Sequence, residues 1–172
     1  MKSVDKYFTN GQLPWLVQAY KSGQTMLMSI LTKTWPSEYA LSAAYVQALT
    51  DAFYDRSQLP DDCPPPDAPL SPRSRLSAAD RERCLIALLA SQRAGFALAV
   101  HVYIALMEGV FPEEIANVLL LAGMYSGADS FNSGLNVLGK TMDALEALAA
   151  SNDRAQLQVE AVFKKLVAAF PT

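Results

Sequence analysis

The sequence predicts an all-α protein, a compact bundle of about six helices around a helical hairpin. Apolar residues recur at steps of three and four along most of the chain, which is the period of an amphipathic helix. Prolines, glycines and a serine stand where such helices would begin or end. We find no convincing strand pattern, and the length of 172 residues suits one compact domain.

Residues 1–56 predict a pair of amphipathic helices. Pro14 suits a first helical position, and the apolar stripe after it extends to about residue 32. Pro36 begins a second stripe, which ends near residue 55.

Residues 57–76 predict a connecting arm that is rich in proline. Six of the ten prolines lie in this part of the chain, and Cys63 lies among them. Proline removes an amide donor and disfavours helix at the residue before it. We therefore expect an extended arm that wraps the surface or a neighbouring subunit.

Residues 77–172 predict the helical core. Ser77 suits a helix N-cap, and the helix after it is expected to end between Ser91 and Gly95. The next helix, from about Phe96 to Glu108, is apolar on every side, which indicates burial on every side. Further helices are expected at about 112–125, 130–149 and 153–170.

Charge and composition argue against several classes of function. The chain has 14 basic and 17 acidic residues without a basic stripe, which argues against nucleic acid and anionic membranes as partners. Its apolar runs are shorter than a membrane span, and the absence of a signal-peptide pattern predicts a cytoplasmic protein. Two cysteines and one histidine fit no metal or redox spacing, so we expect no metal and no cofactor.

His101 and Glu82 are the candidate acid–base pair. On one continuous helix the two would lie about 28 Å apart, but a chain reversal near Ser91 reduces their axial offset to about 4.5 Å. A hairpin would therefore let them meet, and a carboxylate beside a buried imidazole could support proton transfer. The alternatives are a core histidine with one hydrogen bond and a Glu82 on a solvated face.

One stretch of the sequence carries a family pattern. It reads LSAADRERCLIALLASQRAGFALAVHVYIALMEGVFPEEIANVLLLAGMYSGADSFNSGL. Its most specific pieces are the spacing His101…Ala105-Leu106…Gly109-Val110, then Pro112-Glu113-Glu114-Ile115, then Tyr125-Ser126-Gly127. Over about residues 76–147 the chain resembles the carboxymuconolactone decarboxylase family, which includes γ-carboxymuconolactone decarboxylase and the alkylhydroperoxidase D-type proteins. The resemblance implies an all-α core that assembles into homotrimers or homohexamers.

The chain departs from the peroxidase branch of that family. That branch carries a Cys-x-x-Cys pair just before its histidine, and the matching positions here are Ala94 and Ala97. Cys84 lies too early in the chain to substitute, so thiol peroxidase and disulfide reductase chemistry rank last. The resemblance nevertheless places that branch's proton-handling glutamate on Glu82 and its histidine on His101.

The decarboxylase branch needs no cysteine, because loss of CO2 from a lactone acid needs charge stabilisation and a general acid. Ala97-Leu98 stands where that branch usually has Glu-Leu, and Phe111 replaces a small hydroxyl residue. Arg93 is the candidate anchor for a substrate carboxylate, ahead of Arg81 and Arg83; a solvated turn residue is the alternative. Tyr125 is the candidate ligand-contacting phenol, with structural packing as its alternative.

These observations favour a cofactor-free lyase that acts on a small carboxylated lactone or ring compound, as in the breakdown of aromatic compounds. His101 would be the general acid or base, and Glu82 would hold or relay protons. The alternative function is an oligomeric binding or scaffold protein of the same family without turnover.

Overall fold

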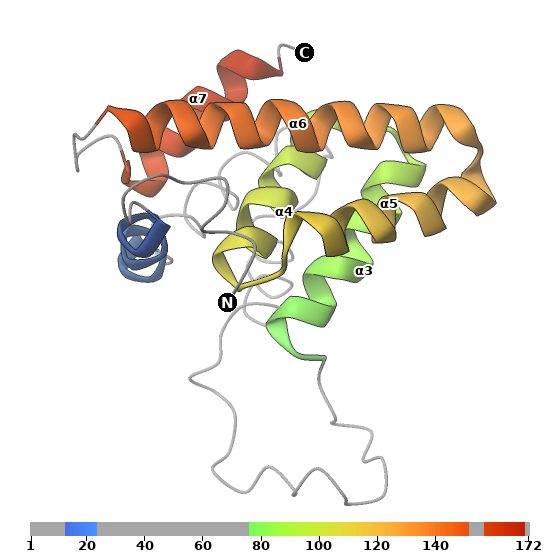
Figure 1. Cartoon of the computed structure of the whole chain (residues 1–172), viewed down its shortest axis with the longest axis horizontal. Helices are drawn as coiled ribbons and strands as arrows, with labels where there is room; N and C mark the ends of the chain where they lie inside the picture. The colour runs from blue at the N-terminus through green and yellow to red at the C-terminus, as the bar shows by residue number, and fades with distance from the viewer. Residues whose placement is uncertain (1–12, 24–75, 152–156, 171–172) are drawn as a thin grey trace, which may run out of the picture. The chain divides into compact units, whose positions relative to one another are not determined.

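The structure is a computed structural model of the chain, and it describes residues 13–23, 76–151 and 157–170. These residues form six helices and no strand, which confirms the all-α prediction for this part of the chain (Figure 1). The first helix covers residues 13–23. The others are α3 (Ala78–Ser91), α4 (Gly95–Met107), α5 (Pro112–Ser126), α6 (Ala128–Ala150) and α7 (Val159–Ala169).

Most helix bounds follow the start and stop residues of the sequence, but α7 begins at Val159, six residues after the predicted start near 153. α3 begins directly after Ser77, and α5 begins at Pro112, as predicted. α4 begins at Gly95 and α6 at Ala128, each within two residues of the predicted start. The helix predicted over residues 36–55 and nearly all of the proline-rich arm, Cys63 included, lie outside the described residues.

Contacts divide the chain into two compact units. One unit consists of Met1–Gln24 and Ala78–Thr172, and the other of Thr25–Ser77. The N-terminal helix therefore belongs with the core helices, to which three close approaches attach it. Tyr20 packs its ring against Tyr103 of α4 and donates a hydrogen bond to Glu108, and Gly23 lies against Val159 of α7.

The turn between α3 and α4 makes the predicted hairpin. Arg93 adopts a left-handed backbone conformation with φ of 56°. Its amide donates to the carbonyl of Ala90, and the amide of Ala94 donates to the carbonyl of Leu89. This pair of bonds is a Schellman motif, which satisfies carbonyls at a helix end and reverses the chain.

α4 is the central helix of this unit. Every residue from Leu98 to Met107 is buried, as the apolar pattern on all sides predicted. α4 packs against α3, α6 and α7, so neighbouring helices surround it. Its far end closes with a second Schellman motif, in which Gly109 supplies the positive φ of 85°.

α5 and α6 form a second close-packed hairpin. A Cβ on Gly123 would lie 2.6 Å from the Cβ of Phe131, and one on Gly134 would lie 2.7 Å from a methyl of Leu119. Each glycine thus lets the facing helix approach closely. No helix in the described ranges is long and apolar enough to cross a membrane.

Candidate acid–base site

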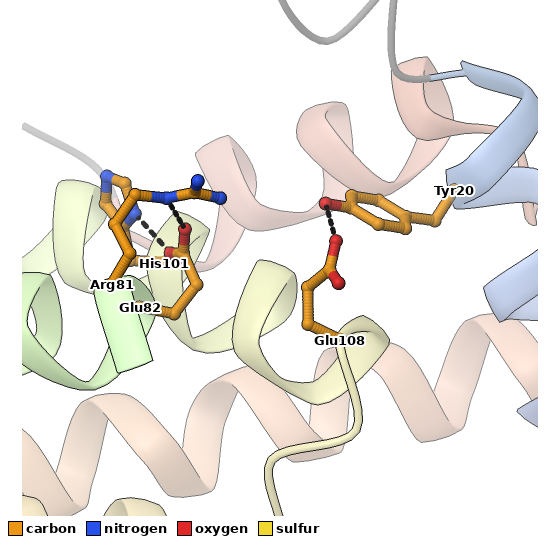
Figure 2. Close-up of polar contacts among 5 residues, drawn as sticks. All are labelled: Tyr20, Arg81, Glu82, His101 and Glu108. Atoms are coloured by element: carbon orange, nitrogen blue, oxygen red, sulfur yellow. Dashed lines mark hydrogen bonds and ion pairs between the residues drawn. The ribbon is translucent and has the colours of Figure 1, made fainter. Parts of the chain in front are cut away.

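The α3–α4 hairpin brings Glu82 and His101 into contact. The Nδ1 atom of His101 lies 2.8 Å from Oε2 of Glu82, within hydrogen-bond distance (Figure 2). Glu82 is completely buried, and His101 is 4% exposed. The reversal at Arg93 places one residue of the pair on each limb of the hairpin, as the residue spacing allowed.

Arg81 contacts the other oxygen of the same carboxylate. Its Nε lies 3.3 Å from Oε1 of Glu82, and its side chain is only 13% exposed. Figure 2 shows the guanidinium and the imidazole approaching the Glu82 carboxylate together. A buried carboxylate is costly unless it is paired and hydrogen-bonded, and here both of its oxygens are engaged.

The contacts assign different environments to the two nitrogens of His101. Because an ionised carboxylate only accepts hydrogen bonds, this contact requires a proton on Nδ1, which donates the hydrogen bond to Oε2 of Glu82. The described residues give Nε2 no hydrogen-bond partner. Within the same ranges, the one fully buried side-chain nitrogen or oxygen that lacks a partner is Tyr103 Oη.

No thiol joins this site in the described part of the chain. Ala94 and Ala97 are partly exposed, and Ala97 lies one helical turn before His101 on the same helix. Cys84 is free and exposed. It follows Glu82 by two residues on α3, so its side chain points about 200° away from the carboxylate.

No hydrogen bond or ion pair in the described residues joins Arg93 or Tyr125 to the Glu82–His101 pair. Arg93 lies in the α3–α4 turn, eight residues before His101, or about 12 Å along a helix. Its side chain is 57% exposed and forms a 3.5 Å ion pair with Asp129. Tyr125 is 94% exposed near the end of α5. Their proposed contacts with a substrate stay predictions.

A second polar cluster, which the sequence did not reveal, lies away from this pair in Figure 2. The Tyr20 hydroxyl donates to Oε1 of Glu108 over 3.1 Å. The rings of Tyr20 and Tyr103 meet edge to face, with centroids 5.8 Å apart. Burial raises the pKa of Tyr103 well above its ordinary value. The cluster fastens the N-terminal helix to α4.

The contact of Arg81 with Glu82 is a feature of the site that the sequence does not indicate. Adjacent helix residues point about 100° apart, so the sequence gives no reason to expect Arg81 and Glu82 in contact. The described residues bring together no cluster of three or more His, Cys, Asp or Glu side chains that could bind a metal.

Comparison with known proteins gives one match. Residues 68–140 match the model of the Carboxymuconolactone decarboxylase family. No curated protein and no solved structure matches the chain. The matched segment contains Glu82, Ala94, Ala97 and His101. The resemblance drawn from the sequence is therefore confirmed over residues 68–140, which are similar to the carboxymuconolactone decarboxylase family.

Proposed function

We propose that the protein is a cofactor-free lyase that removes CO2 from a small carboxylated lactone or ring compound by acid–base catalysis. The observation that supports the proposal is the buried Glu82–His101 contact, which engages Nδ1 of the imidazole and leaves Nε2 without a hydrogen-bond partner in the described residues. A histidine with one ring nitrogen held by a carboxylate is suited to act as a general acid or base at the other nitrogen.

The proposed chemistry assigns one proton to His101. When the bond to the substrate carboxylate breaks, its electron pair stays on the substrate as an enolate, and CO2 leaves. The imidazolium of His101 then donates the proton from Nε2 to that carbon, and solvent restores the proton. In the net reaction, the substrate carboxylate and one proton are consumed, and one C–H bond and one CO2 are formed.

The two alanines support this class of chemistry over thiol chemistry. The peroxidase branch needs a nucleophilic thiolate and a resolving thiol, and Ala94 and Ala97 supply neither. Proton transfer through His101 needs no thiol, so the site keeps the general acid that decarboxylation requires.

The test is CO2 release from γ-carboxymuconolactone and from a panel of related lactone carboxylic acids. We expect His101→Gln to lower kcat by roughly 10²–10⁴-fold, the range for loss of general acid–base catalysis. Lys164→Gln is the control, because Lys164 is exposed and pairs with Glu160 on α7. Near-wild-type turnover in folded His101→Gln protein would contradict the proposal. Binding of a panel member without turnover would favour the non-catalytic alternative.

A further inference from the structure

We infer that Arg81 is a positioning residue that makes Glu82 an orienting carboxylate and not a proton relay. Proton exchange at the site then passes through Nε2 of His101 alone. The catalytic consequence of this inference rests on the proposed function. Its structural part concerns only which nitrogen of the His101 imidazole carries a proton.

The inference is based on two consecutive hydrogen-bond contacts. Arg81 Nε donates to Oε1 of Glu82 over 3.3 Å, and Oε2 of Glu82 lies 2.8 Å from Nδ1 of His101. All three side chains are largely or completely buried, with exposed fractions of 13%, 0% and 5%. Water therefore competes weakly with these bonds, and the carboxylate keeps one orientation.

The charge of Arg81 decides what Glu82 can do with a proton. A proton that moved from Nδ1 to Glu82 would leave a neutral carboxylic acid beside a guanidinium. The bond from Arg81 would then lose its ionised acceptor, and charge-assisted hydrogen bonds are roughly twice as strong as neutral ones. Arg81 thus opposes transfer to Glu82.

This arrangement fixes the tautomer of His101. Nδ1 keeps its proton whether the imidazole is neutral or charged, because Glu82 stays an acceptor. Only Nε2 gains and loses a proton. A substrate atom that is protonated at this site must therefore face Nε2.

The direct test is a two-bond ¹H–¹⁵N NMR spectrum of His101 in uniformly labelled protein without ligand. His101 is the single histidine of the chain, so the imidazole signals need no assignment. We expect the neutral imidazole of the wild-type protein to show a protonated Nδ1 and an unprotonated Nε2. Arg81→Gln and Arg81→Met should give a mixture of tautomers. Arg81→Lys should largely restore the wild-type pattern, because it returns the charge.

The matched control is Arg83→Gln. It removes the same charge from the same helix two residues further on, but Arg83 contacts Asp80 and Glu114. Its His101 spectrum should be that of the wild-type protein. Arg81→Met keeps most of the apolar stem, so it provides a folded variant if Arg81→Gln fails to fold.

Two NMR results would overturn the inference. One is an unchanged Nδ1–H tautomer in a folded Arg81→Gln or Arg81→Met variant, which would mean that Glu82 acts without Arg81. The other is an Nε2–H tautomer in the wild-type protein. Loss of the tautomer preference in those variants, with recovery in Arg81→Lys, supports the inference.

Kinetics separate this inference from the proposed function. If γ-carboxymuconolactone is a substrate, we expect Arg81→Gln to lower kcat at least about tenfold with little change in KM. This loss of kcat is smaller than the roughly 10⁴-fold loss that a wrong histidine tautomer causes in a serine-protease triad. If no lactone turns over, the proposed function fails, and the tautomer experiment still decides the role of Arg81.

Discussion

At Arg93, the role of the backbone in the α3–α4 turn can be tested separately from the role of the side chain. Its φ of 56° is the one positive value at a non-glycine position among the described residues. A left-handed conformation costs about 1–2 kcal/mol for a residue with a Cβ, whereas glycine adopts it readily. Gly109 occupies the equivalent position at the end of α4.

We therefore predict that Arg93→Gly leaves the free energy of unfolding unchanged or raises it by up to about 1 kcal/mol. The substitution also removes the ion pair with Asp129, but this pair is exposed and contributes little to the free energy of unfolding. Because the backbone is kept, any increase in KM for a carboxylated substrate would report the side chain alone. Urea denaturation and steady-state kinetics measure the two effects. A large loss of stability would contradict our view of this turn.

Tyr103 carries a buried hydroxyl without a partner in the described residues. Such a group costs about 1–3 kcal/mol when it is desolvated and unsatisfied. We therefore predict that Tyr103→Phe is neutral at pH 7 or raises the free energy of unfolding by about 1 kcal/mol. A loss of several kcal/mol would show that the hydroxyl has a bonding role.

The raised pKa of Tyr103 predicts a further dependence on alkaline pH. Above about pH 10 the unfolded chain loses the phenol proton while the folded protein retains it, so the unfolded state binds fewer protons. The free energy of unfolding should then fall with rising pH by up to about 1.4 kcal/mol per pH unit from this group. Denaturation curves of wild type and Tyr103→Phe should diverge above pH 10 and run parallel below pH 9.

At the scale of helices, the α5–α6 hairpin depends on Gly123. A methyl group there would lie 2.6 Å from the Cβ of Phe131, an atom that cannot move without its backbone. We predict that Gly123→Ala lowers the free energy of unfolding by about 1–3 kcal/mol through overpacking. Gly139→Ala on α6 is the control, because a Cβ there meets nothing within 4 Å. Its higher helix propensity should stabilise the protein by about 0.5–1 kcal/mol. Equal effects of the two changes in thermal denaturation would contradict the close packing.

The sequence predicted the core helices well because their signals are local. Ser77 and Pro112 mark helix starts, and the apolar pattern of α4 matches its burial on all sides. The α3–α4 turn was predicted only as a break near Ser91, because nothing in the residue type of Arg93 indicates a left-handed conformation. The packing of Gly123 on Phe131 also escaped prediction, since it depends on how two helices approach each other.

Part of the candidate site could also be predicted from the sequence. A reversal between Glu82 and His101 follows from helix geometry, so their contact could be expected from residue spacing. The contacts of Arg81 with Glu82 and of Tyr20 with Glu108 depend on side-chain rotamers and on a helix far away in the sequence. No periodic pattern encodes either contact.

At the scale of the whole molecule, the apolar surface of α5 predicts self-association. Exposed apolar residues recur along its second half: Leu120, Leu121, Met124 and Tyr125. A contiguous apolar surface of this kind is typical of a protein interface. We propose that the protein forms a homotrimer or homohexamer through this surface.

The change that tests this proposal is Met124→Glu, since Met124 is among the most exposed apolar residues described. Burying a charge at an interface is unfavourable, so light scattering should show a smaller species than the wild-type oligomer. Val167→Glu places the same charge on an exposed position of α7 and should leave the mass unchanged. A wild-type monomer at micromolar concentration would refute the proposal.

The central claim is that Glu82 and His101 form a working site that is open to a ligand. The most direct measurement is the NMR signal of the His101 imidazole during addition of lactone carboxylates and dicarboxylates. Our account predicts that the signal moves with at least one compound and loses that movement in Glu82→Gln protein. An imidazole signal that responds to no compound would mean a sealed core histidine and would contradict the claim.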